Sequence, residues 1–456
     1  MTASPVIPAT AQATLPRFAS RLLGPASIWV LVVAQAVLWT FRRPGGESVG
    51  SYIGQLLGAE AVLLMSIGLV LISTLPWVEP WFDGIDRAAI WHRRTMIAGL
   101  VLLAPHVALA SNDDPTGAGP ALGVAGILGL IALVVWAILP RWQSIAPAPV
   151  RGAVLAVRDV SWVRAVRSVF GGYARWRSLH RTTGLFLAAG FAHGLLDGTA
   201  FHSAVLRWSY VAVGGIGLAF YVYRELLARY LVPLHDYQVD GVRPISAGLY
   251  EIALRPLGRR FDFVPGQFAL LYLEGKDGWH RHPFTISSAP HEDVVRVTVK
   301  ALGDFTSSIP GLIEPGMPAV IGGAHGRFDH RRGTQRQVWI AAGVGIAPFL
   351  SWLRSAADGD LAHRVDFFYT VKGAAPFGDE LRAIAQLHSA LHLHIVDTGV
   401  DGRLTPERVL ADAGGDPRGL SVFMCGPAGM LGAFQAQLRR AGVSAGHIHR
   451  EYFDLR

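Results

Sequence analysis

The sequence predicts a multi-domain membrane protein, in which a bundle of six apolar helices precedes a small antiparallel β-barrel and an α/β nucleotide-binding domain. Composition is the first reason. Of the 456 residues, 51% are hydrophobic and only 16% are charged, with a mean hydropathy of +0.35, whereas about a quarter of residues are charged in soluble domains. The second reason is a change of pattern near residue 231, where helix-long apolar runs give way to short strands.

Six apolar stretches are each about long enough to span a bilayer, near 24–41, 56–78, 88–109, 121–139, 178–196 and 204–223. Arginines crowd the connection after the fourth stretch, and SNDDPTGAGP and LDGTAFHS, after the third and fifth, contain no Lys or Arg. The positive-inside rule therefore predicts an integral protein of an inner or plasma membrane with both termini cytoplasmic. Arg42 and Arg43, in the first outer loop, argue against this topology. The arginine-rich fourth connection is either an amphipathic segment along the headgroups or an ordinary basic loop.

Four histidines inside two of these stretches are candidate metal ligands. His92 and His106 are 106 − 92 = 14 residues apart, and His180 and His193 are 193 − 180 = 13 apart. Each pair is thus separated by roughly 20 Å along a helix. A packing role is common for one intramembrane histidine, but two helices with such similar pairs favour ligation of two haems by neutral imidazoles.

Both histidine-bearing helices run outward from the cytoplasm in this topology. His92 is therefore expected to pair with His180 near the cytoplasm, and His106 with His193 near the outer face. An iron with two histidine ligands has no open position, so it passes single electrons without readily binding substrate.

A spacing of 13 residues is about 140° out of helical phase. We therefore expect a distortion of the fifth helix around Gly184 and Gly190. The arginines beside His92, which are Arg93 and Arg94, are expected either to pair with haem propionates or to anchor the helix at the headgroups.

Cysteine count and charge limit the other partners. A single cysteine, Cys425, excludes intrachain disulfides and a four-cysteine iron–sulfur cluster. The net charge of +8 comes largely from arginines near the membrane, which indicates membrane lipids as partners and not nucleic acid. The chain is expected to divide into a cytoplasmic lead (1–23), the helical bundle (24–230), the barrel (231–332) and the α/β domain (333–456).

The last two domains are predicted from strand patterns. Short alternating or β-branched runs such as LYEIAL, QFALLYLE and VVRVTVKAL, separated by Gly and Pro turns, predict the barrel. QVWIAA, RVDFFYT, LHLHIV and GLSVFMC read as buried strands that alternate with helices. In QVWIAAGVGIAPFLSWLR, Gly343 and Gly345 permit close backbone approach before a helix N-terminus that can bind a pyrophosphate, with Pro348 at the third motif position. Lys372 and Arg403 are candidates for a 2′-phosphate or for a solvated surface.

The segment HRHPFTISSAP resembles the flavin motif of ferredoxin-reductase-type domains, whose R/H-P-Y/F-S/T pattern binds FAD. The matching residues are His282, Pro283, Phe284 and Thr285. The resemblance implies that Thr285 lies near the flavin ring as a catalytic residue, with Ile286 and Ser287 beside it. PGQF and VKALGDFT also match, and they imply an FAD diphosphate near Lys300, Gly303 and Thr306.

Two C-terminal segments carry the same resemblance further. MCGPAGM resembles the nicotinamide-side motif of this family, which implies cofactor-binding roles for Cys425, Gly426 and Pro427 and a catalytic one for Cys425. REYFDLR resembles the closing acidic–aromatic element, in which Glu451 and Phe453 would cover the flavin edge and Phe453 would be catalytic. GGAHG stands where related chains often have GPYG.

With its six stretches and two histidine pairs, the chain resembles the ferric reductase and NADPH oxidase superfamily from about residue 24 onward. The resemblance implies an NAD(P)H-dependent oxidoreductase that passes electrons through FAD and two b-type haems to the far side of the membrane. NADPH and NADH are both open as donors.

The terminal acceptor is open between a ferric chelate near Asp113 and Asp114, dioxygen reduced to superoxide with help from Arg207 or His202, and a periplasmic redox partner. A membrane haem-binding or transport protein without catalytic relay is the alternative of another class.

Overall fold

The computed structural model describes residues 17–73, 75, 77–110, 117–138, 173–231, 233–275, 278–302, 304–356 and 361–451. The chain forms two compact units, of which the helical unit comprises Ser20–Phe82 with Arg87–Arg229 and the other contains Tyr230 and the residues after it. The predicted ligand residues Gly303 and Phe453, the acidic pair Asp113 and Asp114, and the fourth connection 139–172 lie outside the described residues.

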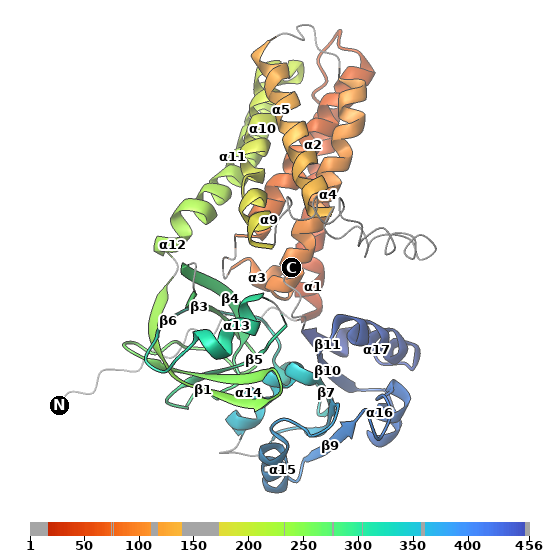
Figure 1. Ribbon diagram of the computed structural model, residues 1–456. Coiled ribbons are helices and arrows are strands. Elements are labelled where there is room, and N and C mark those ends of the chain that lie inside the picture. The colour runs from red at the N-terminus through yellow and green to blue at the C-terminus, as the bar shows by residue number, and fades with distance from the viewer. Residues whose placement is uncertain are drawn as a thin grey trace, which may run out of the picture. The chain divides into compact units, whose positions relative to one another are not determined.

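The helical unit consists mainly of long helices (Figure 1). They are α1 Arg17–Thr40, α2 Val49–Leu71, α3 Glu79–Phe82, α4 Ile85–Leu109, α5 Ala118–Ile138, α9 Tyr173–His180, α10 Thr183–Asp197, the 3₁₀ turn η2 Thr199–His202, and α11 Ala204–Val222. A π-helical turn, η3 Tyr223–Leu227, then continues into α12 Ala228–Leu231.

Four of the six predicted spans are helices long and apolar enough to cross a membrane. They cover Leu22–Thr40, Val49–Leu71, Ala118–Trp136 and Ala204–Leu227. The two histidine-bearing segments fall short, because α4 includes Arg93 and Arg94 with both of its histidines and α10 has only 15 residues. The six helical segments therefore exist, but the histidines lie on the two that are less suited to face lipid.

The second span was predicted at 56–78, which is wrong by about two helical turns at each end. Helix α2 begins at Val49 because the side chain of Ser48 accepts a hydrogen bond from the backbone N–H of Ser51 at 3.1 Å. Such a cap stabilises a helix start, and the polar residues of this first turn hide it from a search for apolar runs. The helix ends at Leu71.

The distortion expected in the fifth span is present, but not at Gly184 or Gly190. The helix breaks at Arg181 and Thr182, immediately after His180. There the Thr182 N–H donates to Leu179 O at 3.0 Å, and the Thr182 hydroxyl donates to the same carbonyl at 2.7 Å. Threonine hydroxyls that bond nearby carbonyls compete with the regular helix ladder, which explains why the break falls at these residues.

The predicted antiparallel barrel is confirmed by a six-stranded sheet with the order β4-β3-β6-β1-β2-β5. Its strands are β1 Leu234–Ser246, β2 Leu249–Pro256, β3 Phe268–Gly275, β4 Gly278–Thr285, β5 Val295–Lys300 and β6 Pro318–His325, with α13 Asp304–Leu312 between β5 and β6. A bridge between Ile286, the residue after β4, and Val297 of β5 joins the two edges of the sheet. The sheet therefore curls into a barrel around a core that includes Tyr237, Ile252 and Leu271.

The α/β prediction is confirmed by a parallel five-stranded sheet, ordered β11-β10-β7-β8-β9. Its strands are β7 Arg336–Ala342, β8 Arg364–Val371, β9 Leu391–Asp397, β10 Leu420–Cys425 and β11 Ile448–Glu451. The helices are α14 Ala347–Ala356, α15 Gly378–Leu387, α16 Pro406–Asp412 and α17 Ala428–Arg440, and the 3₁₀ turns are η4 His330–Arg332, η5 Gly343–Ile346 and η6 Ala445–His447. Strands β7, β8 and β10 are almost wholly buried, as expected for a parallel sheet.

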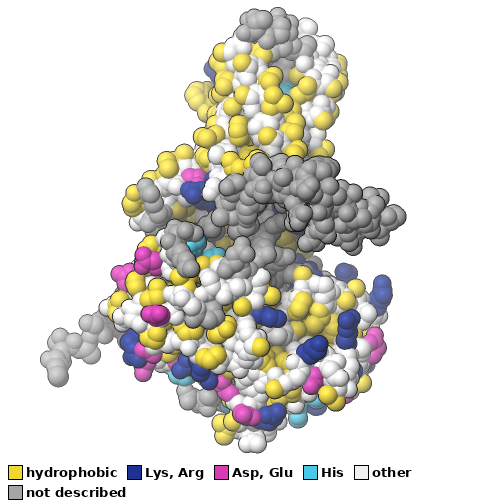
Figure 2. All heavy atoms as spheres, in the orientation of Figure 1, with side chains coloured by type: hydrophobic (Ala, Val, Ile, Leu, Met, Phe, Trp, Pro, Cys, Tyr) yellow, Lys and Arg dark blue, Asp and Glu magenta, His cyan; other side chains and the backbone are white. Residues whose placement is uncertain are grey.

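The two units differ in their surfaces (Figure 2). Hydrophobic side chains dominate the visible face of the helical unit. Within that unit, the side chains of Trp29, Val30, Val101 and Trp208 are each more than 60% exposed. Lys, Arg, Asp and Glu are scattered over the visible face of the C-terminal unit. Large exposed apolar surface is unusual in a soluble protein, so the helical unit has the surface of a membrane bundle.

Candidate functional site

The four histidines form two close pairs in the helical unit. The ring centroids of His92 on α4 and His180 on α9 are 6.3 Å apart, with an interplanar angle of 82°. Those of His106 on α4 and His193 on α10 are 6.1 Å apart, at 68°. The structure therefore brings together the partners that the topology argument paired.

Backbone carbonyls orient three of these rings. The Nδ1 of His92 lies 2.8 Å from Gly68 O, and the Nδ1 of His106 lies 2.8 Å from Gly54 O. A ring nitrogen at hydrogen-bond distance from a carbonyl oxygen must carry the proton that it donates. In His92 and His106 this nitrogen is Nδ1, so the Nε2 lone pair is free. Metal-bound histidines commonly hold their second ring nitrogen in this way.

His193 has two acceptors on Nδ1, Gly119 O at 3.0 Å and the Asp197 carboxylate at 2.9 Å. A carboxylate partner raises the basicity of an imidazole ligand. Sequence reasoning missed Asp197, although its position four residues after His193 places it one helical turn away.

Two glycines make room for the rings of His106 and His193. A Cβ at Gly58 of α2 would lie 2.8 Å from His106 Nδ1, and one at Gly123 of α5 would lie 3.0 Å from His193 Cγ. The contact at Gly58 is shorter than real side chains allow, and the one at Gly123 is tighter than most real contacts. Larger residues at these positions would displace the rings.

The spacing of each histidine pair fits one iron between two imidazoles. Two metal–nitrogen bonds of about 2 Å, with the distance from each nitrogen to its ring centre, give a separation of about 6 Å. Among the residues that the structure describes, no group of three or more His, Cys, Asp or Glu side chains could hold a metal ion. Two protein ligands are enough for haem, because the macrocycle supplies the others.

The flavin motif continues from an edge strand of the barrel into the bridge that closes it. His282, Pro283, Phe284 and Thr285 end β4, and Ile286 bridges to Val297. Thr285, Ile286 and Ser287 are buried, whereas Pro283 is exposed. The Ser287 hydroxyl is buried without a hydrogen-bond partner within the described ranges, which suits a segment that binds a polar group.

Two further residues implied in FAD binding lie near the end of β5. Lys300 is the last residue of that strand and is exposed. The Thr306 hydroxyl accepts a hydrogen bond from Leu302 N–H at 3.1 Å, so it fixes the chain at the start of α13. A lysine ammonium and a threonine hydroxyl are groups that can bind a diphosphate, so Lys300 and Thr306 fit the implied role.

The glycine turn after β7 requires its glycines. Gly343 has φ +55°, a left-handed conformation that glycine adopts without strain. A Cβ at Gly345 would overlap the carbonyl oxygen of Cys425 and lie 2.6 Å from its carbonyl carbon. A Cβ at Gly426 would lie 2.8 Å from the Ala342 Cβ. The ends of β7 and β10 therefore approach closely beside the start of α14, where Pro348 is the second residue.

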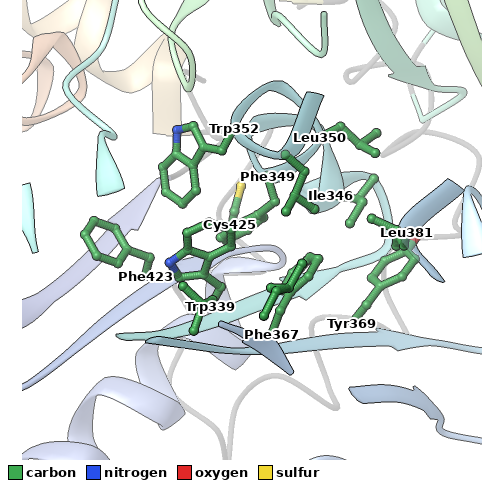
Figure 3. Packing of buried hydrophobic residues seen from close by; sticks show 14 of the residues in the cluster. Trp339, Ile346, Phe349, Leu350, Trp352, Phe367, Tyr369, Leu381, Phe423 and Cys425 are labelled. Atoms are coloured by element: carbon green, nitrogen blue, oxygen red, sulfur yellow. The ribbon is translucent and has the colours of Figure 1, made fainter. Parts of the chain in front are cut away.

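Cys425 is fully buried at the end of β10. Figure 3 shows it among the rings of Trp339, Phe349 and Trp352. Glu451 pairs in register with Cys425 from β11. Burial, together with the charge of Glu451, raises the pKa of the Cys425 thiol, so this thiol is suited to contact a ring and not to act as a nucleophile. Pro427 follows as the N-cap residue of α17.

Lys372 and Arg403 are both exposed, on the loops that follow β8 and β9. Asp397, at the end of β9, accepts hydrogen bonds from Gly373 N–H at 2.9 Å and Gly399 N–H at 2.8 Å. These two donors lower the pKa of Asp397. The carboxylate therefore stabilises the two loops that carry Lys372 and Arg403.

Sequence reasoning missed a buried arginine that connects the barrel to the α/β domain. Arg354 of α14 donates from Nη1 to Glu251 Oε1 and to Ser287 O, both at 2.9 Å. It also donates from Nε and Nη2 to the two carboxylate oxygens of Glu380 on α15, at 2.6 and 3.0 Å. Ser351, one turn earlier, donates to Ser288 O at 2.7 Å. The flavin-motif segment is thus bonded directly to the helix that follows the glycine turn.

Ionisation strengthens this contact. Burial alone would raise the pKa of Glu251, but the charges and hydrogen bonds of Arg354 and Arg243 outweigh it and lower the pKa. Burial would lower the pKa of Arg354, but Glu380 and Glu251 raise it. Both partners therefore stay charged. The available sequence signal was an arginine within the otherwise apolar run APFLSWLRSA.

Models of known families match both halves of this region. Residues 242–328 match the FAD-binding domain, and residues 339–436 match the oxidoreductase NAD-binding domain. The C-terminal part is a ferredoxin-reductase-type FAD and NAD module. We call residues 234–451 the reductase module. The chain accordingly contains the FAD-binding and NAD-binding domains of an oxidoreductase.

Similar proteins include reductases and an oxidase. The reductase component of propane 2-monooxygenase from Mycolicibacterium smegmatis is 29% identical over 225 residues, which cover 44% of this chain and 63% of the relative. A superoxide-generating NADPH oxidase heavy chain from Dictyostelium discoideum is 27% identical over 355 residues, covering 69% of this chain and 64% of that protein. The chain thus matches a little under two thirds of the length of each.

Among solved structures, the flavohemoglobin from Malassezia yamatoensis with bound FAD and heme has a TM-score of 0.50 and 16% identity. The match covers 89% of this chain and 99% of that one. At this identity the likeness concerns the fold alone.

Substitution of Gly345 by valine is expected to abolish reduction of the module by NAD(P)H. The new side chain would force the glycine turn away from the backbone of Cys425 and Gly426, so we expect at least tenfold slower flavin bleaching in stopped-flow absorbance. Gly432→Ala is the matched control, because a Cβ there meets nothing within 4 Å and alanine stabilises a helix interior by about 0.5–1 kcal/mol. Equal bleaching rates in Gly345→Val and the control would contradict the assignment of this turn.

Proposed function

We propose that this protein is a transmembrane electron-transfer enzyme that oxidises NAD(P)H and delivers electrons through FAD and two bis-histidine haems to an acceptor outside the cytoplasm, in the manner of a ferric reductase. The observation that carries the proposal is the coexistence, in one chain, of a reductase module and two histidine pairs within a helical unit that has an apolar surface. A haem-binding or transport protein has no need of the module.

The two units have different roles in this proposal, and the residues of the reductase module bind the nucleotide and the flavin. When bound, FAD would supply a hydride acceptor for NAD(P)H, and flavin and haem iron would both supply single-electron exchange. Gly343, Gly345 and Gly426 let the nucleotide approach the backbone beside the start of α14. Arg354 holds the flavin-motif segment against that helix. Cys425 and Glu451 fill the adjoining strand ends.

The histidine pairs are held at two levels of the bundle. The carbonyls that fix His92 and His106 belong to Gly68 and Gly54, which are 68 − 54 = 14 residues apart on α2. That corresponds to about 21 Å along the helix axis, most of the hydrocarbon thickness. In the predicted topology the His92–His180 pair is the inner one. Export of an electron from a negative-inside cell is favoured by about 2.3 kcal/mol per 100 mV.

Production of superoxide from dioxygen is the second candidate function. Its support is the relative from Dictyostelium discoideum, because 69% of 456 residues is about 315, whereas the chain from Leu234 to its last residue has only 223. The similarity to that oxidase therefore extends into the helical unit. Arg207 and the exposed His202, whose Nδ1 lies 2.7 Å from Thr199 O, are the residues that would assist dioxygen.

The test uses the purified, haem-loaded protein. Anaerobic stopped-flow mixing with NADPH should reduce the haem absorbance bands after the flavin, and haem that stays oxidised while FAD is bound would reject the electron path. Ferric-chelate reduction and superoxide release are then compared at matched acceptor concentrations. Faster ferric reduction supports the first proposal, and dominant superoxide release supports the second.

A further inference from the structure

The helical unit contains an apolar cavity that the histidine pairs do not use. Its volume is about 300 Å³, and it lies between α1, α2, α11 and the segment that contains α3. Ser27 and Leu31 line it from α1, Leu63 and Ser66 from α2, Trp77 from the segment before α3, and Ile216 from α11. All of these elements belong to the same compact unit.

Three buried polar side chains of α1 and α2 have atoms without a hydrogen-bond partner among the described residues, and one of them lines the cavity. Ser66, which lines it, is 3% exposed, and its hydroxyl has no hydrogen-bond partner among the described residues. Glu60 is 5% exposed, and neither of its carboxyl oxygens has a partner there. Gln35 is 9% exposed, with its amide nitrogen equally unpaired. Buried polar atoms are normally hydrogen-bonded, so the unpaired atoms of Ser66, Glu60 and Gln35 indicate a missing polar partner.

Helical spacing places the three groups in relation to the cavity. Glu60 precedes Leu63 by three residues and Ile67 by seven, so it extends the cavity-lining face of α2 by one turn. Gln35 follows Leu31 by four residues and extends the lining face of α1 in the same way. An intramembrane ionisable residue is a functional candidate in its own right.

The chemistry of these unpaired polar groups indicates the kind of ligand. The Ser66 hydroxyl, the Gln35 amide and a protonated Glu60 are all hydrogen-bond donors. A molecule that fits must be apolar over most of its surface and must carry carbonyl acceptors. We propose that the cavity binds a membrane quinone, as a second electron acceptor of this enzyme.

The position is suited to that role. Ile67, which lines the cavity, precedes Gly68, whose carbonyl bonds His92 Nδ1 at 2.8 Å. The cavity and the His92 ring therefore contact the same turns of one helix, whose diameter is about 10 Å with side chains. A quinone there would lie beside the proposed inner electron carrier.

The reaction balances with groups that are available. NAD(P)H gives a hydride, which is two electrons and one proton, and water on the cytoplasmic side gives a second proton. The two quinone carbonyls become hydroxyls and the nicotinamide is oxidised, so NAD(P)H + H⁺ + quinone gives NAD(P)⁺ + quinol. Glu60 carries an exchangeable proton one turn from Leu63 and can relay it. This reduction rests on the proposed electron path, whereas binding does not.

Binding is tested with the full-length protein in nanodiscs and decyl-ubiquinone as the probe, with an azido analogue to map the site. We expect cross-links on peptides of α1 and α2. Ser66→Ala should weaken binding about fivefold, the effect of one neutral hydrogen bond. Ile67→Trp should fill the cavity and weaken binding more than tenfold. Retained FAD and an unchanged Tm establish that each variant is folded.

The controls change the same residue types elsewhere. Ser209→Ala removes a hydroxyl that bonds Leu206 O within its own helix at 2.8 Å, and Ile53→Trp alters a side chain of α2 that is 42% exposed. Both should bind the probe like the unmodified protein. Cross-links confined to other peptides, binding that Ile67→Trp leaves unchanged, or a cavity that retains only phospholipid would each overturn the proposal.

Two measurements separate this inference from the proposed function. If NADPH reduces the haems but decyl-ubiquinone fails to bind, the quinone site is rejected and the electron path stands. If the probe binds and the haems stay oxidised, the site stands and the reduction step is rejected with the electron path. With both intact, Ser66→Ala should slow anaerobic quinone reduction and leave ferricyanide reduction unchanged.

Discussion

Alanine at His92 or at His180 is expected to remove the same haem, and alanine at His106 or His193 to remove the other. Each pair has ring centroids 6.1 to 6.3 Å apart, so one iron needs both rings, and a single imidazole holds haem far less tightly. The measurement is the reduced-minus-oxidised absorbance spectrum with the haem-to-protein ratio. We expect that ratio to fall from two to one in every single variant, and the double variant His92→Ala/His180→Ala to keep one haem.

The control for these variants is His392→Ala, which removes an exposed imidazole of β9 and should keep both haems. A ratio of two in His92→Ala or His180→Ala would reject the pairing. Asp197→Asn extends the test to the carboxylate that orients a ligand. It removes the negative charge beside His193 Nδ1, so we expect about 10–100-fold weaker haem binding at the His106–His193 site alone, with the spectrum of the other haem unchanged.

In the membrane part, the sequence predicts a helix correctly where the ends of the helix coincide with the ends of an apolar run. The stretch predicted at 204–223 agrees closely with α11, because apolarity itself marks its ends. The start of α2 depends on the Ser48 cap, and the break after His180 depends on the Thr182 hydroxyl. Neither effect changes mean hydropathy, so a search for apolar runs places the second span and the distortion wrongly.

The candidate sites divide in the same way. His92 and Thr285 were recognisable because unusual residues or local motifs mark them. Gly58, which makes room for His106, could not be found, because its role depends on the packing of α2 against α4. Arg354 joins segments more than 100 residues apart, which no local pattern encodes. Glu60 was recognisable as an acid in an apolar run. Only the structure shows that its carboxyl oxygens have no hydrogen-bond partner among the described residues.

Substitution of Arg354 by methionine is expected to destabilise the reductase module by about 3–5 kcal/mol, the cost of removing one member of a buried ion pair. Glu251 would lose its buried partner, since its carboxylate is 5% exposed and Arg243, which remains, is 61% exposed. For a module of this size the Tm should fall by roughly 6–20 °C, measured by calorimetry. Arg354→Lys keeps the charge but cannot bond Glu251, Ser287 and Glu380 together, so an intermediate loss is expected.

The dependence on pH distinguishes loss of the ion pair from loss of packing. The pKa of Glu251 is lowered in the folded protein, so its contribution is present above its unfolded pKa and is lost as pH falls through the folded value. Methionine removes that contribution, and acid then neutralises the charge left behind. The difference in Tm between wild type and Arg354→Met should therefore narrow as pH falls, whereas a packing defect would leave it constant. Arg382→Met, which breaks an exposed pair with Asp379, should change stability by less than about 0.5 kcal/mol at any pH.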